Sequence, residues 1–114
     1  ISAHAPSDPR LDKMETDAIK AAFKDHAYRL AISSIKSTIG NPVAAAAPMQ
    51  VVTALLSLKD QRIPPTINYE YPDPDCDLDY TPNKLRYNKV KNILVNSHGF
   101  GGNCSALIVR KFEG

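Results

Sequence analysis

The stretch Ser33-Ser34-Ile35-Lys36-Ser37-Thr38-Ile39-Gly40-Asn41-Pro42 leads into the apolar segment 43–58. Residues 30–35 are predicted to form a short strand. A long helix is predicted to begin near Asn41-Pro42, because Asn is a favoured N-cap and Pro is tolerated at the first helical position. Pro48 either kinks this helix or marks its true start. The stretch thus places a lysine and an asparagine between a strand and a helix, where α/β proteins hold polar groups against a substrate.

The N-terminal region predicts a second helix. Apolar residues recur at helical intervals over about 12–24, and Asp12 stands three residues before Glu15 in a variant of the capping-box spacing. Further on, residues 62–68 are predicted to be extended. Residues 69–82 form an acidic, proline-containing segment whose alternating aspartates resemble a calcium loop. It lacks the turn glycine and the closing glutamate, so a solvated surface loop is predicted.

The C-terminal region predicts two strands joined by a glycine-rich loop. The strands cover about 89–96 and 105–112, and the loop covers 99–102. The order of the elements predicts an α/β fold, a mixed sheet covered by helices, with residues 1–114 forming a single domain.

Composition limits the classes of function. The chain has 114 residues, 43% of them hydrophobic, which suffices for a buried core. A net charge of +2 among 14 basic and 12 acidic side chains gives no sustained field, so neither nucleic acid nor a membrane surface is predicted as a partner. Segment 43–58 is too short to span a bilayer.

The cysteines and the N-terminus bear on compartment and completeness. Cys76 and Cys104 lack metal-type spacing and are interpreted as free thiols of a reducing compartment, which favours the cytoplasm. No signal-peptide pattern is visible. The chain opens without Met on Ile1-Ser2-Ala3, which resembles the tail of a strand, so we expect a piece of a longer protein.

Three polar residues are candidates for chemistry. His4 follows a predicted strand end, where a neutral imidazole can polarise a carbonyl or move a proton, although it could equally close a turn. The Lys36 ammonium can stabilise developing negative charge, although an isolated lysine is usually at the surface. Asn41 can donate its amide to a carbonyl oxygen, cap a helix, or do both. His26 and His98 show no partner pattern.

The glycine-rich loop is a fourth candidate. Gly99, Gly101 and Gly102 surround Phe100 and join two strands with no helix behind them, so a dinucleotide or P-loop site is excluded by context. The glycines allow close backbone approach to a ligand and exposed N–H groups that can hold an oxyanion. Phe100 is either aimed into such a site or a core aromatic.

Six motifs extend over nearly the whole chain. They are His4-Ala5-Pro6-Ser7-Asp8, Asp12-Lys13-Met14-Glu15-Thr16-Asp17-Ala18-Ile19-Lys20, Ser33-Ser34-Ile35-Lys36-Ser37, Ile63-Pro64-Pro65-Thr66-Ile67-Asn68, Asp77-Leu78-Asp79-Tyr80 and Gly99-Phe100-Gly101-Gly102. In order and spacing they resemble the C-terminal part of β-ketoacyl-acyl-carrier-protein synthases.

The resemblance implies half of a thiolase-like fold and a decarboxylative Claisen condensation between an enzyme-bound acyl thioester and malonyl-acyl carrier protein, in fatty acid or polyketide synthesis. It implies no cofactor and no metal. The partners it implies are acyl carrier protein with a phosphopantetheine-linked substrate, the N-terminal half of the ketosynthase, and a second subunit in a homodimer or heterodimer. The family's cysteine nucleophile lies in the N-terminal half, and neither Cys76 nor Cys104 matches it, so this chain alone could not complete the reaction.

By position, His4 resembles the first catalytic histidine, Lys36 the active-site lysine and Phe100 the gating phenylalanine of the oxyanion loop. The sequence also departs from the family pattern. Asn41 replaces the histidine that opens the long helix, and Gln50 replaces a glutamate partner of the lysine. Pro6 and Asp8 replace two pantetheine-binding threonines, and Cys104 stands where an asparagine is usual.

Two interpretations of these departures remain open. Asn41 is functional if the protein resembles the initiating synthases and chalcone-synthase relatives, which use a Cys-His-Asn set. Alternatively, the protein resembles a noncatalytic chain-length factor, which retains the fold and partners an active synthase. Loss of both threonines favours the second interpretation, and retention of His4 and Lys36 favours the first.

Overall fold

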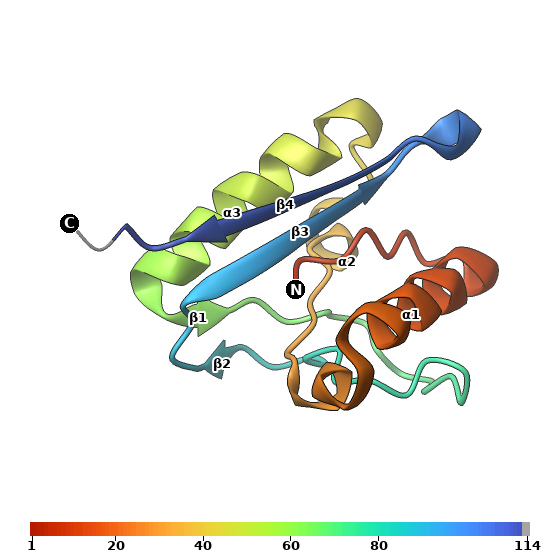
Figure 1. The fold of residues 1–114 in the computed structure, drawn as a ribbon, viewed down its shortest axis with the longest axis horizontal. Helices are drawn as coiled ribbons and strands as arrows, with labels where there is room; N and C mark the ends of the chain where they lie inside the picture. The colour runs from red at the N-terminus through yellow and green to blue at the C-terminus, as the bar shows by residue number, and fades with distance from the viewer. Residues whose placement is uncertain (113–114) are drawn as a thin grey trace.

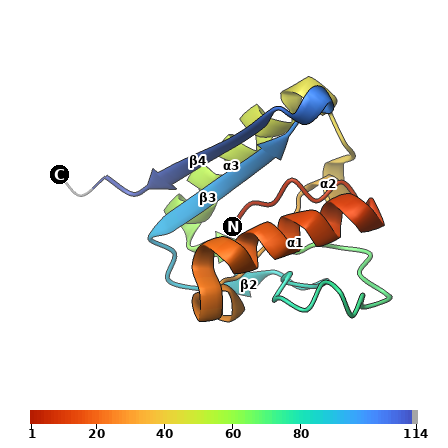
Figure 2. The same ribbon diagram turned by 45° about the vertical axis from the view of Figure 1, so that its right-hand side comes forward.

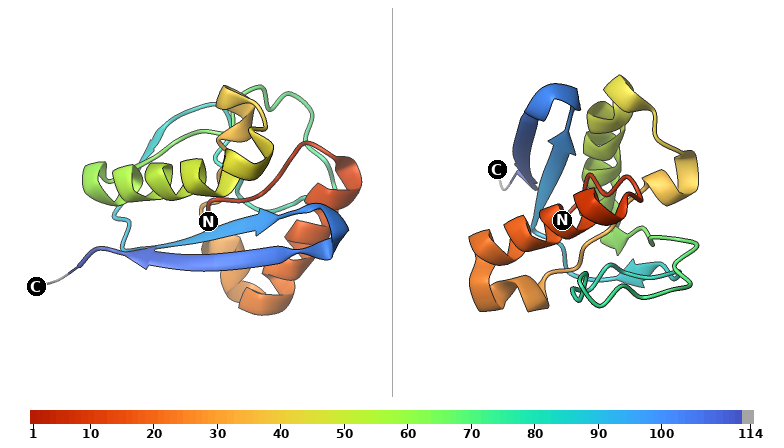
Figure 3. Two further views of the ribbon diagram at one scale, coloured as in Figure 1. Left: turned by 90° about the horizontal axis from the view of Figure 1, so that it is seen from above. Right: turned by 90° about the vertical axis from the view of Figure 1, so that its right-hand side faces the viewer.

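Two long helices lie on opposite sides of an extended N-terminal segment in the computed structural model, which describes residues 1–112 (Figures 1 and 3). The helices are α1 (Pro9–Phe23), α2 (Lys36–Ile39) and α3 (Ala46–Asp60), with 3₁₀ turns at Lys24–Arg29, Val43–Ala45 and Phe100–Gly102. The strands are β1 (Arg62–Ile63), β2 (Arg86–Tyr87), β3 (Asn92–His98) and β4 (Cys104–Arg110). None of the described helices is long and apolar enough to cross a membrane.

The strands form two antiparallel pairs that the N-terminal segment helps to connect. β1 pairs with β2, and β3 pairs with β4 in a register that sets His98 opposite Cys104. Ser2 makes parallel bridges to Ser33 on one side and to Val95 of β3 on the other. The N-terminal segment is therefore the middle strand of a mixed arrangement, and its end at His4 lies beside the carboxyl end of β3.

Helix α3 lies along the β3–β4 hairpin (Figures 1 and 2). Alternate residues of β3 are buried against it, as expected for a strand with one covered face, and the resulting cluster contains Ala54, Leu58, Ile93 and Val95. A second cluster under α1 contains Ala3, Ile19, Ala27, Ile32 and Leu78. The two clusters lie on either side of the segment that ends at His4.

Helix α1 begins earlier than the sequence pattern suggested. Asp8 is its N-cap, and its carboxylate accepts hydrogen bonds from the backbone N–H groups of Arg10 (2.9 Å) and Leu11 (3.1 Å). Pro9 takes the first helical position, where its missing N–H is not needed. The prediction that Asp12 and Glu15 cap the helix is therefore wrong, which leaves both carboxylates available for other contacts.

Helix α3 begins at Ala46, so the prediction of a start near Asn41-Pro42 is wrong. A 3₁₀ turn, Val43–Ala45, precedes it, and Pro48 lies in its first turn, where a proline costs no hydrogen bond. Of the two interpretations of Pro48, the one that places it at the true start of the helix is correct.

The predicted strand over 30–35 is an extended segment with a single bridge at Ser33. It does not form a full ladder, and its backbone pairs with the N-terminal segment at Ser33 alone. Ser33 N–H donates to the carbonyl of Ile1, and Ala3 N–H donates to the carbonyl of Ser33, both at 2.9 Å. The two C-terminal strands are confirmed, with boundaries shifted by one to three residues, and the glycine loop joins them as predicted.

Candidate active site

The backbone of His4 is held on both sides by buried side chains. Its N–H donates to Glu15 Oε1 at 3.0 Å, and its carbonyl oxygen accepts a hydrogen bond from Lys36 Nζ. His4 is 9% exposed and Lys36 is 8% exposed. The structure thus brings together two of the three residues predicted as catalytic, and the interpretation of Lys36 as a surface lysine is wrong.

Lys36 lies at the start of α2, which directs its side chain back toward the N-terminal segment. Burial lowers the pKa of its ammonium group, and the nearby carboxylates of Glu15 and Asp12 act in the opposite direction. A buried cation is tolerated only when it is compensated. The His4 carbonyl and the two acidic side chains supply that compensation.

Glu15 is a residue of this site that sequence analysis assigned to a helix cap. It is 4% exposed. Its Oε2 accepts from the N–H of Ala5 at 2.8 Å, and its Oε1 accepts from Asn96 Nδ2 of β3 at 3.2 Å in addition to His4. A carboxylate with three donors is well satisfied, so Glu15 joins α1, the His4 segment and β3.

The His4 ring has one aromatic neighbour in the described part of the chain, His98 at the end of β3. The ring centroids are 4.9 Å apart and the planes are inclined by 31°. His4 Nδ1 is buried and has no hydrogen-bond partner among residues 1–112. Burial lowers the pKa of His4, Lys36 and His98 lower it further, and Glu15 opposes them. The environment therefore favours a neutral imidazole at position 4.

Gln50 of α3 supports the same segment. Its side chain is 1% exposed, and its Nε2 lies 2.8 Å from the carbonyl oxygen of Ala3 and 3.1 Å from that of Asn96. Gln50 makes no hydrogen bond to Lys36 in the described structure. Gln50 stands where the resemblance implies a glutamate partner of Lys36. In the structure its side chain instead hydrogen-bonds the two extended segments that lead to His4 and His98.

Asn41 lies on the link between α2 and α3 and is exposed. Its Oδ1 accepts a hydrogen bond from Val43 N–H at 3.1 Å, a local contact across Pro42, which is the N-cap residue of the 3₁₀ turn. Because the oxygen is engaged, the amide NH₂ is the end available to a ligand. Asn41 and Lys36 both line a cavity of about 720 Å³, whereas the His4 side chain does not contribute to its lining.

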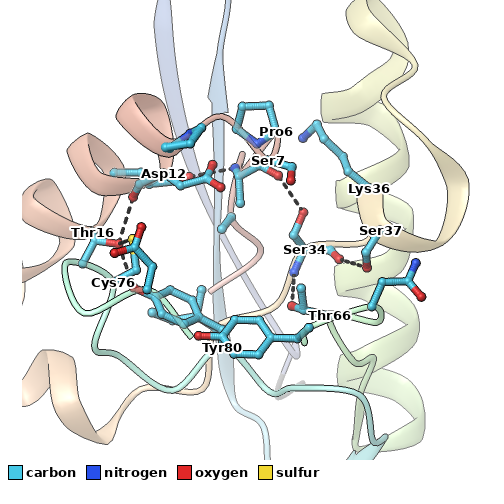
Figure 4. A pocket seen from close by; sticks show the side chains of 18 of the residues that line it. Pro6, Ser7, Asp12, Thr16, Ser34, Lys36, Ser37, Thr66, Cys76 and Tyr80 are labelled. Atoms are coloured by element: carbon cyan, nitrogen blue, oxygen red, sulfur yellow. Dashed lines mark hydrogen bonds between the residues drawn. The ribbon is translucent and has the colours of Figure 1, made fainter. Parts of the chain in front are cut away.

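The cavity extends from Lys36 toward the 69–82 loop (Figure 4). At its far end Thr16 Oγ1 and Tyr80 OH are 2.7 Å apart, and burial raises the pKa of Tyr80 to about 12. Asp12 lies on the wall of the cavity formed by α1. Burial and the neighbouring Glu15 raise the Asp12 pKa to about 6, and its Oδ1 has no partner among the described residues.

The glycine loop lies beyond the end of β3 and away from this cavity's lining. Gly101 and Gly102 have φ angles of 77° and 82°, which explains why glycine is needed there. Phe100 is 93% exposed, so the interpretation of Phe100 as a core aromatic is wrong for the described chain. The loop and His4 come together through β3, because His98 immediately precedes Gly99.

Cys76 and Cys104 are both free, in agreement with the sequence analysis. Residues 1–112 contain no group of three or more His, Cys, Asp or Glu side chains able to hold a metal ion.

Comparison with protein families places this geometry in context. A family model described as β-ketoacyl synthase, C-terminal domain, matches residues 1–70. The chain is 45% identical over 111 residues to 3-oxoacyl-[acyl-carrier-protein] synthase 2 of Coxiella burnetii, covering 97% of the chain and 27% of that protein. It is 42% identical over 109 residues to putative polyketide β-ketoacyl synthase 1 of Streptomyces halstedii, covering 96% and 26%. The chain therefore spans about a quarter of the curated relatives' length.

Two solved ketosynthase structures are also similar to this chain. The ketosynthase complex AntDE:AntF, a type II polyketide-synthase acyl carrier protein with its ketosynthase, superposes with a TM-score of 0.96 at 40% identity and covers 98% of this chain and 28% of that one. The ishigamide ketosynthase/chain length factor gives a TM-score of 0.93 at 33% identity, covering 98% and 27%. These likenesses confirm the thiolase-like α/β fold that the resemblance implied.

Proposed function

The chain belongs to the β-ketoacyl synthase family, as a C-terminal domain, and from that membership we propose that it is part of a longer synthase. That protein joins an enzyme-bound acyl group to malonyl-acyl carrier protein by decarboxylative Claisen condensation, in fatty acid or polyketide synthesis. The proposal assigns His4 and Asn41 to the malonyl thioester and Lys36 to the support of His4.

One observation carries the proposal: both backbone polar groups of His4 are held by buried charged side chains, Glu15 and Lys36. A turn-closing histidine has no need of a buried ammonium and a buried carboxylate, whose desolvation is costly. Such an arrangement holds the His4 backbone in place, and catalysis by a polarising donor depends on accurate placement of the imidazole that this backbone carries.

The chemistry follows from the neutral state of His4. A neutral ring can donate one N–H to the oxygen of the malonyl thioester, and the amide NH₂ of Asn41 can donate a second hydrogen bond without a change of charge. The two donors stabilise the enolate as the bond to the carboxylate breaks and CO₂ leaves. The α-carbon then attacks the acyl carbonyl, and the sulfur of a nucleophilic cysteine outside this chain is the leaving group.

The proposal gives the glycine loop a role at the acyl group. Backbone N–H groups of residues 99–102 hold the oxyanion formed when the acyl carbonyl is attacked. Phe100 gates access to that site. Its almost complete exposure and the positive φ angles of the two glycines that follow support a loop that can change its course when the rest of the synthase is present.

Exposed apolar side chains support the proposal that further protein covers this chain. On β4, Leu107 is 49% exposed and Ile108 is 69% exposed. Neighbouring residues of a strand point to opposite faces, so these two side chains lie on different faces of β4. Both faces of the outer strand therefore carry an exposed apolar side chain, although Val109 packs against the cluster under α3. We assign one to the N-terminal half of the synthase and leave the partner subunit, identical or different, to experiment. Acyl carrier protein is the proposed substrate carrier and the cytoplasm the proposed location.

A second candidate, a noncatalytic partner similar to a chain-length factor, is favoured by Asn41. Its side chain is exposed and accepts a local hydrogen bond from Val43 N–H, a role that needs no substrate. In this candidate the buried Glu15, Lys36 and Gln50 contacts only preserve the fold, and the protein shapes the product tunnel of an active synthase.

The experiment that separates the candidates uses the full-length protein. CO₂ release from malonyl-acyl carrier protein is measured for the wild type and for His4→Ala, with His26→Ala as the control because His26 is exposed and distant in sequence from the site. The proposal expects loss of release in His4→Ala alone. Equal rates in all three proteins would exclude His4 from catalysis and favour the second candidate.

The role of Asn41 is tested separately with Asn41→His. If its amide contacts the thioester, the ratio of CO₂ release to condensation changes. An unaltered ratio would assign Asn41 only to its local hydrogen bond with Val43 N–H.

A further inference from the structure

No sequence pattern indicates a partner for His98, yet the structure places its ring against that of His4. The two residues lie in different strands that end at the same point. Ser2 N–H donates to the carbonyl of Leu94 at 2.8 Å, and Asn96 N–H donates to the carbonyl of Ser2 at 3.0 Å. This parallel register brings His4 level with the last residues of β3 and leaves the two imidazoles 4.9 Å apart.

The register that makes this contact is firmly held. Gln50 Nε2 reaches the carbonyl oxygens of Ala3 (2.8 Å) and Asn96 (3.1 Å), one from each strand. Glu15 joins the same two segments through His4 N–H and Asn96 Nδ2. Two buried side chains on opposite helices therefore hold the strands in line, and the proximity of the rings is a property of the core.

We propose that His98 is a positioning residue for His4: its ring packs on the His4 ring and holds it in place for the proposed chemistry. The inference rests on the proposed function, since it concerns how His4 is held for that chemistry. Two imidazolium rings at this separation repel each other, so one proton on the pair disfavours a second. A positive charge on the neighbouring ring therefore disfavours the imidazolium form of His4 and lowers its pKa.

The other side chains that hold His4 do not by themselves account for the lowering of its pKa. Lys36 of α2 is cationic and acts in the same direction as His98, whereas Glu15 of α1 opposes both. Gln50 of α3 is neutral. Glu15 and Lys36 contact the backbone of His4, whereas the His98 ring lies against the His4 ring. His98 is half-buried, whereas His4 is buried.

The test uses the full-length protein with ¹³C-labelled histidine rings, whose NMR signals are followed against pH. His98→Phe keeps an aromatic ring and removes the titrating group, and His98→Gln is a second neutral replacement should the first fail to fold. The control is His26→Phe, which removes an exposed histidine that packs near Phe23. His4 is expected to titrate at higher pH in either His98 variant and to be unchanged in the control.

A second readout is the rate of CO₂ release from malonyl-acyl carrier protein. The acid limb of the pH profile is expected to move to higher pH in His98→Phe. His98→Ala, which also removes the packing, is expected to lower kcat at neutral pH by roughly tenfold, within the ~100-fold that a 1 Å misplacement can cost. An unchanged His4 titration in both neutral variants overturns the inference. Because NMR needs no turnover, an inactive wild type would overturn the proposed function and leave the His98 result readable.

Discussion

Replacing Glu15 by Ala is expected to release the His4 segment. The Glu15 carboxylate accepts hydrogen bonds from the N–H groups of His4 (3.0 Å) and Ala5 (2.8 Å). Glu15 is 4% exposed, so water cannot readily replace the lost carboxylate. An unsatisfied buried donor costs about 1–3 kcal/mol, which gives about 2–6 kcal/mol for the two backbone groups together. Even the lower value corresponds to an opening equilibrium about 30-fold more favourable.

Hydrogen exchange of the His4 and Ala5 amides in the full-length protein measures this opening directly. The matched control is Asp17→Ala on the same helix, since Asp17 is exposed and makes a surface ion pair with Lys13 at 2.8 Å. A pair of that kind contributes about 0–1 kcal/mol, so exchange at His4 is expected to be unchanged in the control. Equal protection in Glu15→Ala and Asp17→Ala would refute the assignment of Glu15 as the support of His4.

Glu15→Gln sharpens the prediction because it keeps one acceptor oxygen. Oε1 serves two donors, His4 N–H and Asn96 Nδ2, whereas Oε2 serves Ala5 N–H alone. The remaining oxygen is expected to stay with the two donors, so Ala5 should lose protection and His4 should keep it. Loss at both positions would show that the negative charge, and not the acceptor geometry, holds the segment.

Three further predictions follow from buried polar groups. Gln50→Leu leaves the carbonyl oxygens of Ala3 and Asn96 without this donor, so denaturant unfolding should show a loss of about 2–4 kcal/mol; a loss under about 0.5 kcal/mol would contradict the role given to the amide. Asp8→Ala removes the cap of α1 and should cost about 1 kcal/mol in the same assay, whereas an unchanged unfolding free energy would mean that solvent replaces the cap. Burial holds the His4 pKa below its ordinary 6.5, so the unfolded chain binds the proton first as the pH falls. The free energy of unfolding should therefore decline below about pH 6.5, and His4→Gln should make this decline shallower. Urea titrations at pH values above and below about 6.5 check both expectations.

The order of elements was predictable from the sequence because it depends on local patterns. Apolar spacing located both long helices, and the glycine loop located the hairpin of β3 and β4. Helix starts were the weak point. The Asp12–Glu15 spacing and Asn41-Pro42 each imitate a cap, but Asp8 and the turn after Asn41 satisfy the backbone first, and nothing local distinguishes the competing caps.

The candidate site was predictable only in part, for a different physical reason. His4 and Lys36 follow extended segments, and adjacent strand ends meet at one edge, so their proximity could be expected. Glu15, Gln50 and His98 act through contacts between segments far apart in sequence, mostly to backbone atoms, which leave no periodic pattern. A signal did exist for Glu15, since a buried-face position of an amphipathic helix that carries a carboxylate requires a partner.

In the proposed function, His4 is held by Glu15 and Lys36 and polarises the malonyl thioester. The most direct test of this role is single-turnover condensation: full-length protein is loaded with an acyl group, mixed with malonyl-acyl carrier protein, and the 3-oxoacyl product is followed by mass spectrometry. The His4→Ala variant is expected to accept the acyl group but to form product at least ~100-fold more slowly than the wild type. The His26→Ala variant is expected to match the wild type. Product formation by His4→Ala at the wild-type rate would contradict the role proposed for His4.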